Sequence, residues 1–140
     1  TAVVLKGTRE KVSTGSYIWP CTGEITSDFG YRTVSIGSSN HKGIDIADSY
    51  GTSINASDGG IVVKAEDYYG YGNLVIIQHD NDDLTYYAHL KSMGVEVGDI
   101  VKQGDIVGSM GCTGTASGTH LHFEYRPGGG EPVDPMTILP

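Results

Sequence analysis

Short segments of alternating apolar and polar residues, separated by glycine-rich turns, run along most of the chain. Such alternation is typical of β-strands with one buried face. No segment keeps an apolar period of 3.6 residues, so we expect very little helix. The pattern therefore predicts an all-β, antiparallel fold with strands at Gly23–Ser27, Gly43–Ala47, Gly60–Glu66, Asn73–His79, Leu84–Leu90, Ile106–Met110 and Leu121–Tyr125.

Two turns are predicted on either side of the fourth of these strands. The first contains two glycines within Tyr69–Asn73, and the second is the polar run Asp80–Asp83. Glycine, asparagine and aspartate favour turns because they accept the backbone angles that turns require. The three aspartates of the second turn, Asp80, Asp82 and Asp83, are expected to be solvated, since their spacing does not fit a known calcium-binding loop.

Length and charge limit the classes of protein to consider. The 140 residues fit one domain, and no apolar run is long enough to span a bilayer. The formal net charge of −8 argues against nucleic-acid binding, which depends on neutralising phosphates. Because the chain starts at Thr1, we expect it to be a piece of a longer protein, with a linker or the tail of a preceding domain at 1–16 and one folded domain at 17–140.

The two cysteines, Cys21 and Cys112, leave two interpretations open. In an extracellular protein they could form one disulfide, whereas in a cytosolic protein they would be small, reduced residues. Neither has the CxxC or Cys–His spacing of a metal ligand or a nucleophile.

Four of the five histidines fall in three short clusters, and these clusters carry the candidate chemistry. His41 and Asp45 are four residues apart, and His120 and His122 are two apart. Side chains at even spacing on a strand share one face, so each pair is expected to point to the same side of a sheet. Two neighbouring strands would then present both pairs to one groove, with His89 on a third strand.

Two imidazoles and one carboxylate form a catalytic zinc site that keeps an open coordination position. Such a set also suits non-haem iron(II), but oxygenases of that class commonly use a tighter HxD spacing. The two remaining histidines would move protons, which favours zinc-dependent hydrolysis. The fifth histidine, His79, belongs to no pair and is interpreted as structural.

With these motifs in this order, the chain resembles the lysostaphin-type zinc endopeptidases of bacterial cell walls. The resemblance covers nearly all of 17–140 in the same order. It rests on Trp19-Pro20, Ile25–Arg32, His41–Ala47, Gly72-Asn73, Tyr87–Leu90, Gly98–Val101, Gly104 and Gly118–Glu124.

The resemblance implies a fold, a site and a substrate. The fold would be an antiparallel β-sheet groove with one Zn²⁺ on its floor, held by His41, Asp45 and His122. His120 would be the catalytic base, and His89 would assist it by holding or sharing the proton. The substrate would be a peptide of peptidoglycan, cleaved in the stem or the cross-bridge. The protein would act as a monomer at the cell wall or cell surface, as part of a wall-associated or membrane-anchored protein.

One departure from the lysostaphin pattern concerns a tyrosine shortly before the first ligand histidine. Ser35–Asn40 occupies that stretch here, and Tyr31 lies further back. Loops at Thr33–Asn40, Asp67–Gly72 and Gly111–Gly118 are expected to wall the groove and to set which bond is cut.

Two other functions compete with an active peptidase. A non-catalytic relative would bind wall peptides or activate another hydrolase, and such relatives typically lack one or more of the ligands that this chain keeps. A metal-free β carrier domain would explain the repeated Gly-Asp-Ile-Val at 98–101 and 104–107, but it leaves the histidines unexplained.

Overall fold

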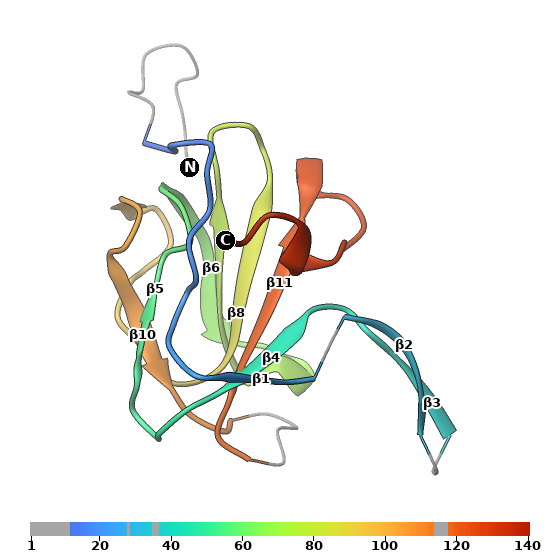
Figure 1. The fold of residues 1–140 in the computed structure, drawn as a ribbon. Coiled ribbons are helices and arrows are strands. Elements are labelled where there is room, and N and C mark those ends of the chain that lie inside the picture. Colours follow the sequence, from blue (N-terminus) through green and yellow to red (C-terminus); the bar gives the residue numbers. More distant parts are fainter. Residues whose placement is uncertain (1–11, 28, 35–36, 114–117) are drawn as a thin grey trace.

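Antiparallel strands account for nearly all of the regular structure. The computed structural model describes residues 12–27, 29–34, 37–113 and 118–140; for 31–41 and Tyr69 it describes the backbone alone. The strands form one large sheet and a separate hairpin (Figure 1). They are β1 (Glu24–Ser27), β2 (Gly30–Val34), β3 (Gly37–His41), β4 (Ile44–Ala47), β5 (Ser53–Asn55), β6 (Gly60–Asp67), β7 (Asn73–Gln78), β8 (Leu84–Met93), β9 (Ile100–Val101), β10 (Ile106–Met110) and β11 (Leu121–Arg126).

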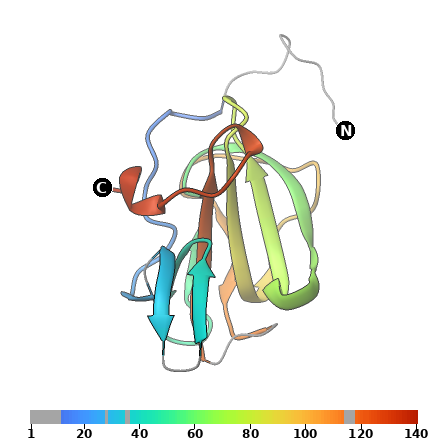
Figure 2. The same ribbon diagram turned by 90° about the vertical axis from the view of Figure 1, so that its right-hand side faces the viewer.

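The order of strands brings distant parts of the sequence together. The large sheet runs β1-β4-β11-β8-β7-β6-β9, and β10 pairs with both β5 and β8. Figure 2 shows β4, β11 and β8 side by side, although they come from the first, last and middle thirds of the chain. Strands β2 and β3 pair only with each other among the described strands. The three predicted histidine clusters therefore lie on or beside adjoining strands.

All seven predicted strands are present, with boundaries that differ by at most three residues. The prediction missed β5 and β9, which are too short to show alternation, and the β2–β3 hairpin, whose polar sequence was interpreted as a loop over Thr33–Asn40. The expectation of very little helix is confirmed. Within the described ranges the helices are three short 3₁₀ turns, η1 (Tyr69–Tyr71), η2 (Pro127–Gly129) and η3 (Pro135–Thr137).

One face of the large sheet forms the main hydrophobic core. Ile44 and Ile46 of β4 and Leu121 and Phe123 of β11 are at most 1% exposed and belong to a single buried cluster. Their alternation with polar residues was predicted from the sequence and is confirmed. Because successive side chains on a strand point to opposite faces, the residues between them face the other side of the sheet.

A smaller apolar cluster forms on that second face. Leu74 and Ile76 of β7 and Ala88 of β8 are buried there and are partly covered by three tyrosines, Tyr68, Tyr71 and Tyr86. β7 is thus buried on both faces, which explains its nearly continuous apolar sequence.

The described part of the predicted linker is fastened to the domain by two aspartates. Asp80 Oδ2 accepts hydrogen bonds from the backbone nitrogens of Val12 and Ser13, both at 2.8 Å. Asp58 accepts from the backbone nitrogens of Thr14 and Gly15, at 2.8 and 3.0 Å. The domain boundary between residues 16 and 17 stays a prediction.

The Asp80–Asp83 turn forms as predicted, but its aspartates are solvated only at the exposed Asp82. The expectation is wrong for the half-buried Asp80, which holds the linker, and for the buried Asp83. That side chain is only 7% exposed. Its Oδ2 accepts hydrogen bonds from the hydroxyls of Tyr17 at 3.0 Å and Tyr125 at 2.8 Å, and its Oδ1 accepts from the Gly128 nitrogen at 2.8 Å. Segments distant in the sequence pack over the turn and remove its last carboxylate from water.

The two cysteines are free, so the structure contains no bridge between them. Cys21 is buried in the main core, and burial together with the nearby Asp48 raises the pKa of its thiol to about 12. Cys112 is exposed. Among the described residues, no helix is long and apolar enough to cross a membrane.

Candidate active site

Asp45 and His122 meet across two neighbouring strands. The pairing of β4 with β11 places His122 opposite Asp45, and both alternate with core residues, so both face the second side of the sheet. His122 Nδ1 lies 3.0 Å from Asp45 Oδ1. The prediction that neighbouring strands bring the HxxxD and HxH motifs together is thus correct for these two residues.

His120 lies just before β11, at an isolated bridge to Gly111. Its Nε2 is 3.7 Å from Asp45 Oδ1, and its Nδ1 is 3.0 Å from the Gly118 carbonyl oxygen. A carbonyl oxygen only accepts hydrogen bonds, so Nδ1 carries the hydrogen and the neutral ring keeps its free electron pair on Nε2. The basic nitrogen of His120 therefore points toward Asp45.

His89 reaches the same face because β8 bulges at this position. Tyr87 pairs with Val75 and Leu90 pairs with Asn73, so β8 advances by three residues where β7 advances by two. Within this bulge His89 has a φ of 64°. The neighbours Tyr87 and Leu90 both belong to the main core, so Ala88 and His89 are consecutive residues on the second face. The His89 ring lies 4.9 Å from the His120 ring and 6.0 Å from the His122 ring, measured between centroids.

The backbone of His41 ends β3, where it pairs with Gly30. Lys42 and Gly43 separate β3 from β4, so His41 lies outside the strand that carries Asp45, as the predicted strand Gly43–Ala47 implies, and the expectation that the two side chains point to one side of the sheet stays a prediction. The His41 side chain lies outside the described part of the structure. Gly43 permits the close approach of β11 here, since a Cβ at this position would meet the Phe123 carbonyl oxygen at 2.1 Å.

A buried network that sequence reasoning missed supports His122 from the other side. Glu124 is fully buried, and its Oε2 lies 2.7 Å from His122 Nε2. Tyr71 donates its hydroxyl hydrogen to the same Oε2 at 2.8 Å, and Arg126 donates from two nitrogens to Oε1 at 2.8 and 2.5 Å. The signal in the sequence was the continued alternation His122, Glu124, Arg126, which places three polar side chains on one face.

Burial and hydrogen bonding shift the pKa values of these groups in opposite directions. Burial lowers the pKa of His122, but the hydrogen bonds to Asp45 and Glu124 outweigh it and raise the value to about 9 in the metal-free protein. Burial raises the pKa of Glu124, but hydrogen bonds from His122, Arg126 and Tyr71 outweigh it and lower the value. Burial lowers the pKa of His89, so its imidazole is neutral at pH 7.

The donors fit a metal as far as their side chains are described. Asp45 Oδ1 and His122 Nδ1 face each other, and the second nitrogen of His122 is tied to a carboxylate, as is typical of metal-binding histidines. Within the described side chains no group of three donors gathers around one point, and the third predicted donor, His41, is not among them. The neutral His89 Nδ1 donates to the Thr113 carbonyl at 2.7 Å, so His89 also keeps a free pair on Nε2.

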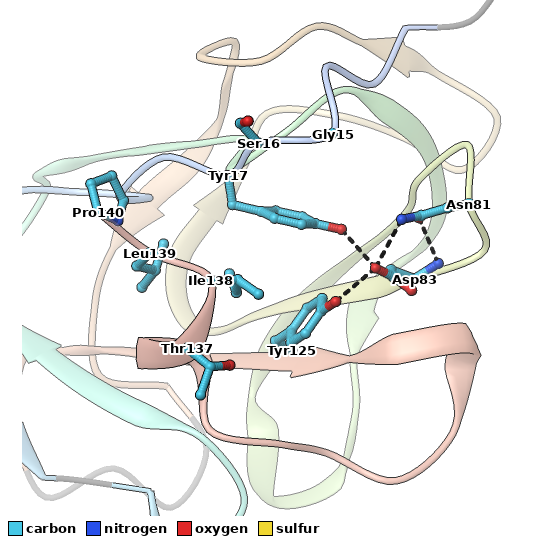
Figure 3. Close-up of a pocket in the computed structure, with 10 residues that line it drawn as sticks. All are labelled: Gly15, Ser16, Tyr17, Asn81, Asp83, Tyr125, Thr137, Ile138, Leu139 and Pro140. Carbon is cyan, nitrogen blue, oxygen red and sulfur yellow. Dashed lines mark hydrogen bonds between the residues drawn. The ribbon is translucent and has the colours of Figure 1, made fainter.

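Two other features lie apart from this site. His79 is buried at the end of β7, where Nδ1 contacts the Gly59 carbonyl at 2.7 Å and Nε2 contacts the Thr85 hydroxyl at 2.9 Å. A cavity of about 460 Å³ opens near Asp83, lined by Tyr17 and Tyr125 and by the last residues of the chain. Figure 3 shows both tyrosine hydroxyls directed at the Asp83 carboxylate, which is thereby occupied by groups of the protein itself.

Comparison with known proteins identifies the family. The model of Peptidase family M23 matches residues 39–135, so the chain belongs to this family. It is 43% identical over 123 residues to the murein hydrolase activator NlpD of Salmonella dublin, covering 87% of this chain and 31% of that protein. The chain thus spans about a third of the length of this relative.

Two solved structures share the fold. A zinc-containing peptidase from Vibrio cholerae superposes with a TM-score of 0.79 and 30% identity, over 85% of this chain and 39% of that one. The catalytic domain of lysostaphin, an antimicrobial peptidase from Staphylococcus simulans, superposes with a TM-score of 0.76 and 31% identity, over 82% of this chain and 90% of that one. The predicted family and the predicted antiparallel β fold are both confirmed.

Proposed function

We propose that this chain is a zinc-dependent endopeptidase that hydrolyses peptide bonds in the stem peptides or cross-bridges of peptidoglycan. The observation that carries the proposal is the convergence of Asp45, His120 and His122 with His89 on one face of the sheet. Three strands and a backbone bulge are needed to bring these groups together. A binding domain has no need of two further imidazoles beside the proposed metal-binding pair.

His41, Asp45 and His122 would hold the zinc ion. Two imidazoles and a carboxylate leave one coordination position open, as in catalytic rather than structural zinc sites. When bound there, zinc supplies Lewis-acid polarisation of the scissile carbonyl and lowers the pKa of the attacking water. Membership of a peptidase family and the similarity to a zinc-containing peptidase support this choice of metal.

His120 would serve as the general base and then as the general acid. The Gly118 carbonyl holds the hydrogen on Nδ1, so Nε2 is free to accept a proton from the attacking water and later deliver it to the leaving amine. His89 would assist by sharing that proton through Nε2, and once protonated there it would stabilise the charge that develops on the carbonyl oxygen. Its burial keeps it neutral at pH 7 before this step, so it begins the reaction able to accept the proton.

The alternative function is that of a domain that activates another murein hydrolase, which the similarity to NlpD supports. We favour the enzyme because the described members of the catalytic set are all present and mutually close. The site is proposed to work at the bacterial cell wall or cell surface. We also propose that the chain functions as a monomeric domain of a longer wall-associated or membrane-anchored protein.

The test is digestion of purified peptidoglycans with different bridge chemistry, followed by mass spectrometry of the released peptides. The zinc-loaded protein should release defined peptides, and a chelator or the Asp45→Asn substitution should abolish their release. The masses identify the bond that is cut. A protein that holds one zinc ion per chain and releases nothing from any wall would contradict the enzymatic proposal and leave the activator.

A further inference from the structure

Glu124 is a fully buried carboxylate beside the site to which the proposed mechanism gives no role. A buried carboxylate is costly unless other groups satisfy its charge. Here His122, Tyr71 and Arg126 all contact its two oxygens. Because each contact comes from the face of the sheet that carries the proposed metal ligands, the network belongs to the site rather than to the main core.

Both nitrogens of His122 lie against carboxylates, but the two carboxylates differ. Asp45 is partly exposed, with 17% of its side chain accessible, whereas Glu124 is not accessible at all. We propose that Glu124 is a positioning residue that holds the Nε2 hydrogen of His122, so that Nδ1 is the nitrogen that gives up its hydrogen and binds zinc. This inference rests on the proposed function, in which His122 is a zinc ligand.

Arg126 and Tyr71 determine which oxygen of the Glu124 carboxylate is available to His122. Arg126 is held over the Tyr86 ring, 4.4 Å from its centroid, and donates two hydrogen bonds to Oε1. Oε1 is therefore committed to Arg126, and Oε2 is left to accept from His122 and Tyr71. Since Tyr71 belongs to η1, the network also ties the loop between β6 and β7 to the proposed metal ligand.

The substitution Glu124→Gln tests this arrangement because Arg126 would choose the orientation of the amide. Arg126 only donates, so the amide oxygen would turn toward it and the amide NH₂ would face His122. His122 Nε2 would then have to accept, which moves the ring hydrogen to Nδ1, where zinc should bind. Replacing Arg126 by Met as well would free the amide to turn its oxygen back toward His122.

The experiment measures zinc affinity by competition with a chelator, together with the absorption spectrum of the Co²⁺-substituted protein. Glu124→Gln should weaken zinc binding about 10–100-fold. The double variant with Arg126→Met should recover part of the loss, which a merely structural role would not allow. The matched control is Asp58→Asn, which removes a buried carboxylate that holds the backbone nitrogens of Thr14 and Gly15 but lies outside the site; its zinc affinity should be unchanged.

Each outcome decides the proposal. A folded Glu124→Gln protein with the zinc affinity of the wild type, or a double variant that recovers nothing, would overturn it. If Glu124→Gln does not fold, Glu124→Asp replaces it, because the shorter side chain keeps the charge but withdraws the carboxylate from His122 Nε2, and unchanged zinc affinity in that variant overturns the proposal. A wild-type protein that binds no zinc overturns the proposed function itself, and this result is distinct because it appears before any substitution is made.

Discussion

The buried Asp83 carboxylate provides a sharp test of what holds the fold together. It joins the N-terminal segment through Tyr17, strand β11 through Tyr125 and the start of η2 through Gly128. Asn81 also donates to its Oδ2, at 3.0 Å. We expect the substitution Asp83→Asn to loosen three parts of the chain at once, although it changes the volume of the side chain very little.

The expected cost follows from the four hydrogen bonds. If the amide oxygen takes the place of Oδ2, the amide nitrogen faces the Gly128 N–H, which leaves that donor unsatisfied at a cost of about 1–3 kcal/mol. The other three bonds change from a charged to a neutral acceptor, and each loses about 0.5–1 kcal/mol. The free energy of unfolding should therefore fall by about 2.5–6 kcal/mol, which is large for a single substitution.

Urea denaturation followed by circular dichroism measures this loss, and the denaturant slope should stay constant because the exposed surface on unfolding is unchanged. Asp82→Asn in the same turn is the matched control. Asp82 is exposed and contacts Gln78 at the surface, so its loss should cost no more than about 0.5 kcal/mol. Equal stabilities for the two variants would refute the assignment of Asp83 as a structural anchor.

The remaining predictions concern His79, Phe123 and His120. Burial lowers the pKa of His79, so below about pH 6.5 the unfolded chain binds a proton that the folded protein does not bind. The urea midpoint of the wild type should therefore fall between pH 7.5 and 5, and the midpoint of the His79→Gln variant should fall less. Equal pH dependence of the two midpoints would contradict this. Phe123→Ala should lower the free energy of unfolding by about 3–5 kcal/mol, while exposed Val97→Ala changes it little. His120→Ala should keep zinc but lose at least about 100-fold in cleavage rate; retained activity would refute its role as the base.

Alternation along strands was enough to predict the core and one half of the site. The positions of Ile44 and Ile46 around Asp45, and of Leu121 and Phe123 around His122, follow from a period of two residues alone. The pairing of these two strands could be expected because only then do the polar residues share a groove. Where one face of a strand is buried and the other is not, the local sequence is sufficient to predict which side chains face the core.

The other half of the site and the burial of Asp83 depend on contacts between distant residues, which the local sequence pattern does not predict. Ala88 faces the site, so strict alternation would place the next residue, His89, in the core. A bulge in β8 turns His89 to the same face as Ala88, and this bulge arises from the pairing of β8 with β7 and β10. Glu124 and Tyr71 become partners only through the order of strands in the sheet. Asp83 looked like an ordinary turn residue because Tyr17, which buries it, lies 66 positions away.

The pair of free cysteines makes the site accessible to spectroscopy without any mutation. Cys21 is buried and its raised pKa leaves almost no reactive thiolate, whereas Cys112 is exposed. Cys112 immediately precedes Thr113, whose carbonyl oxygen accepts the hydrogen bond from His89. A maleimide fluorophore should therefore attach at Cys112 alone and give the native chain an optical reporter one residue from the contact between Thr113 and His89.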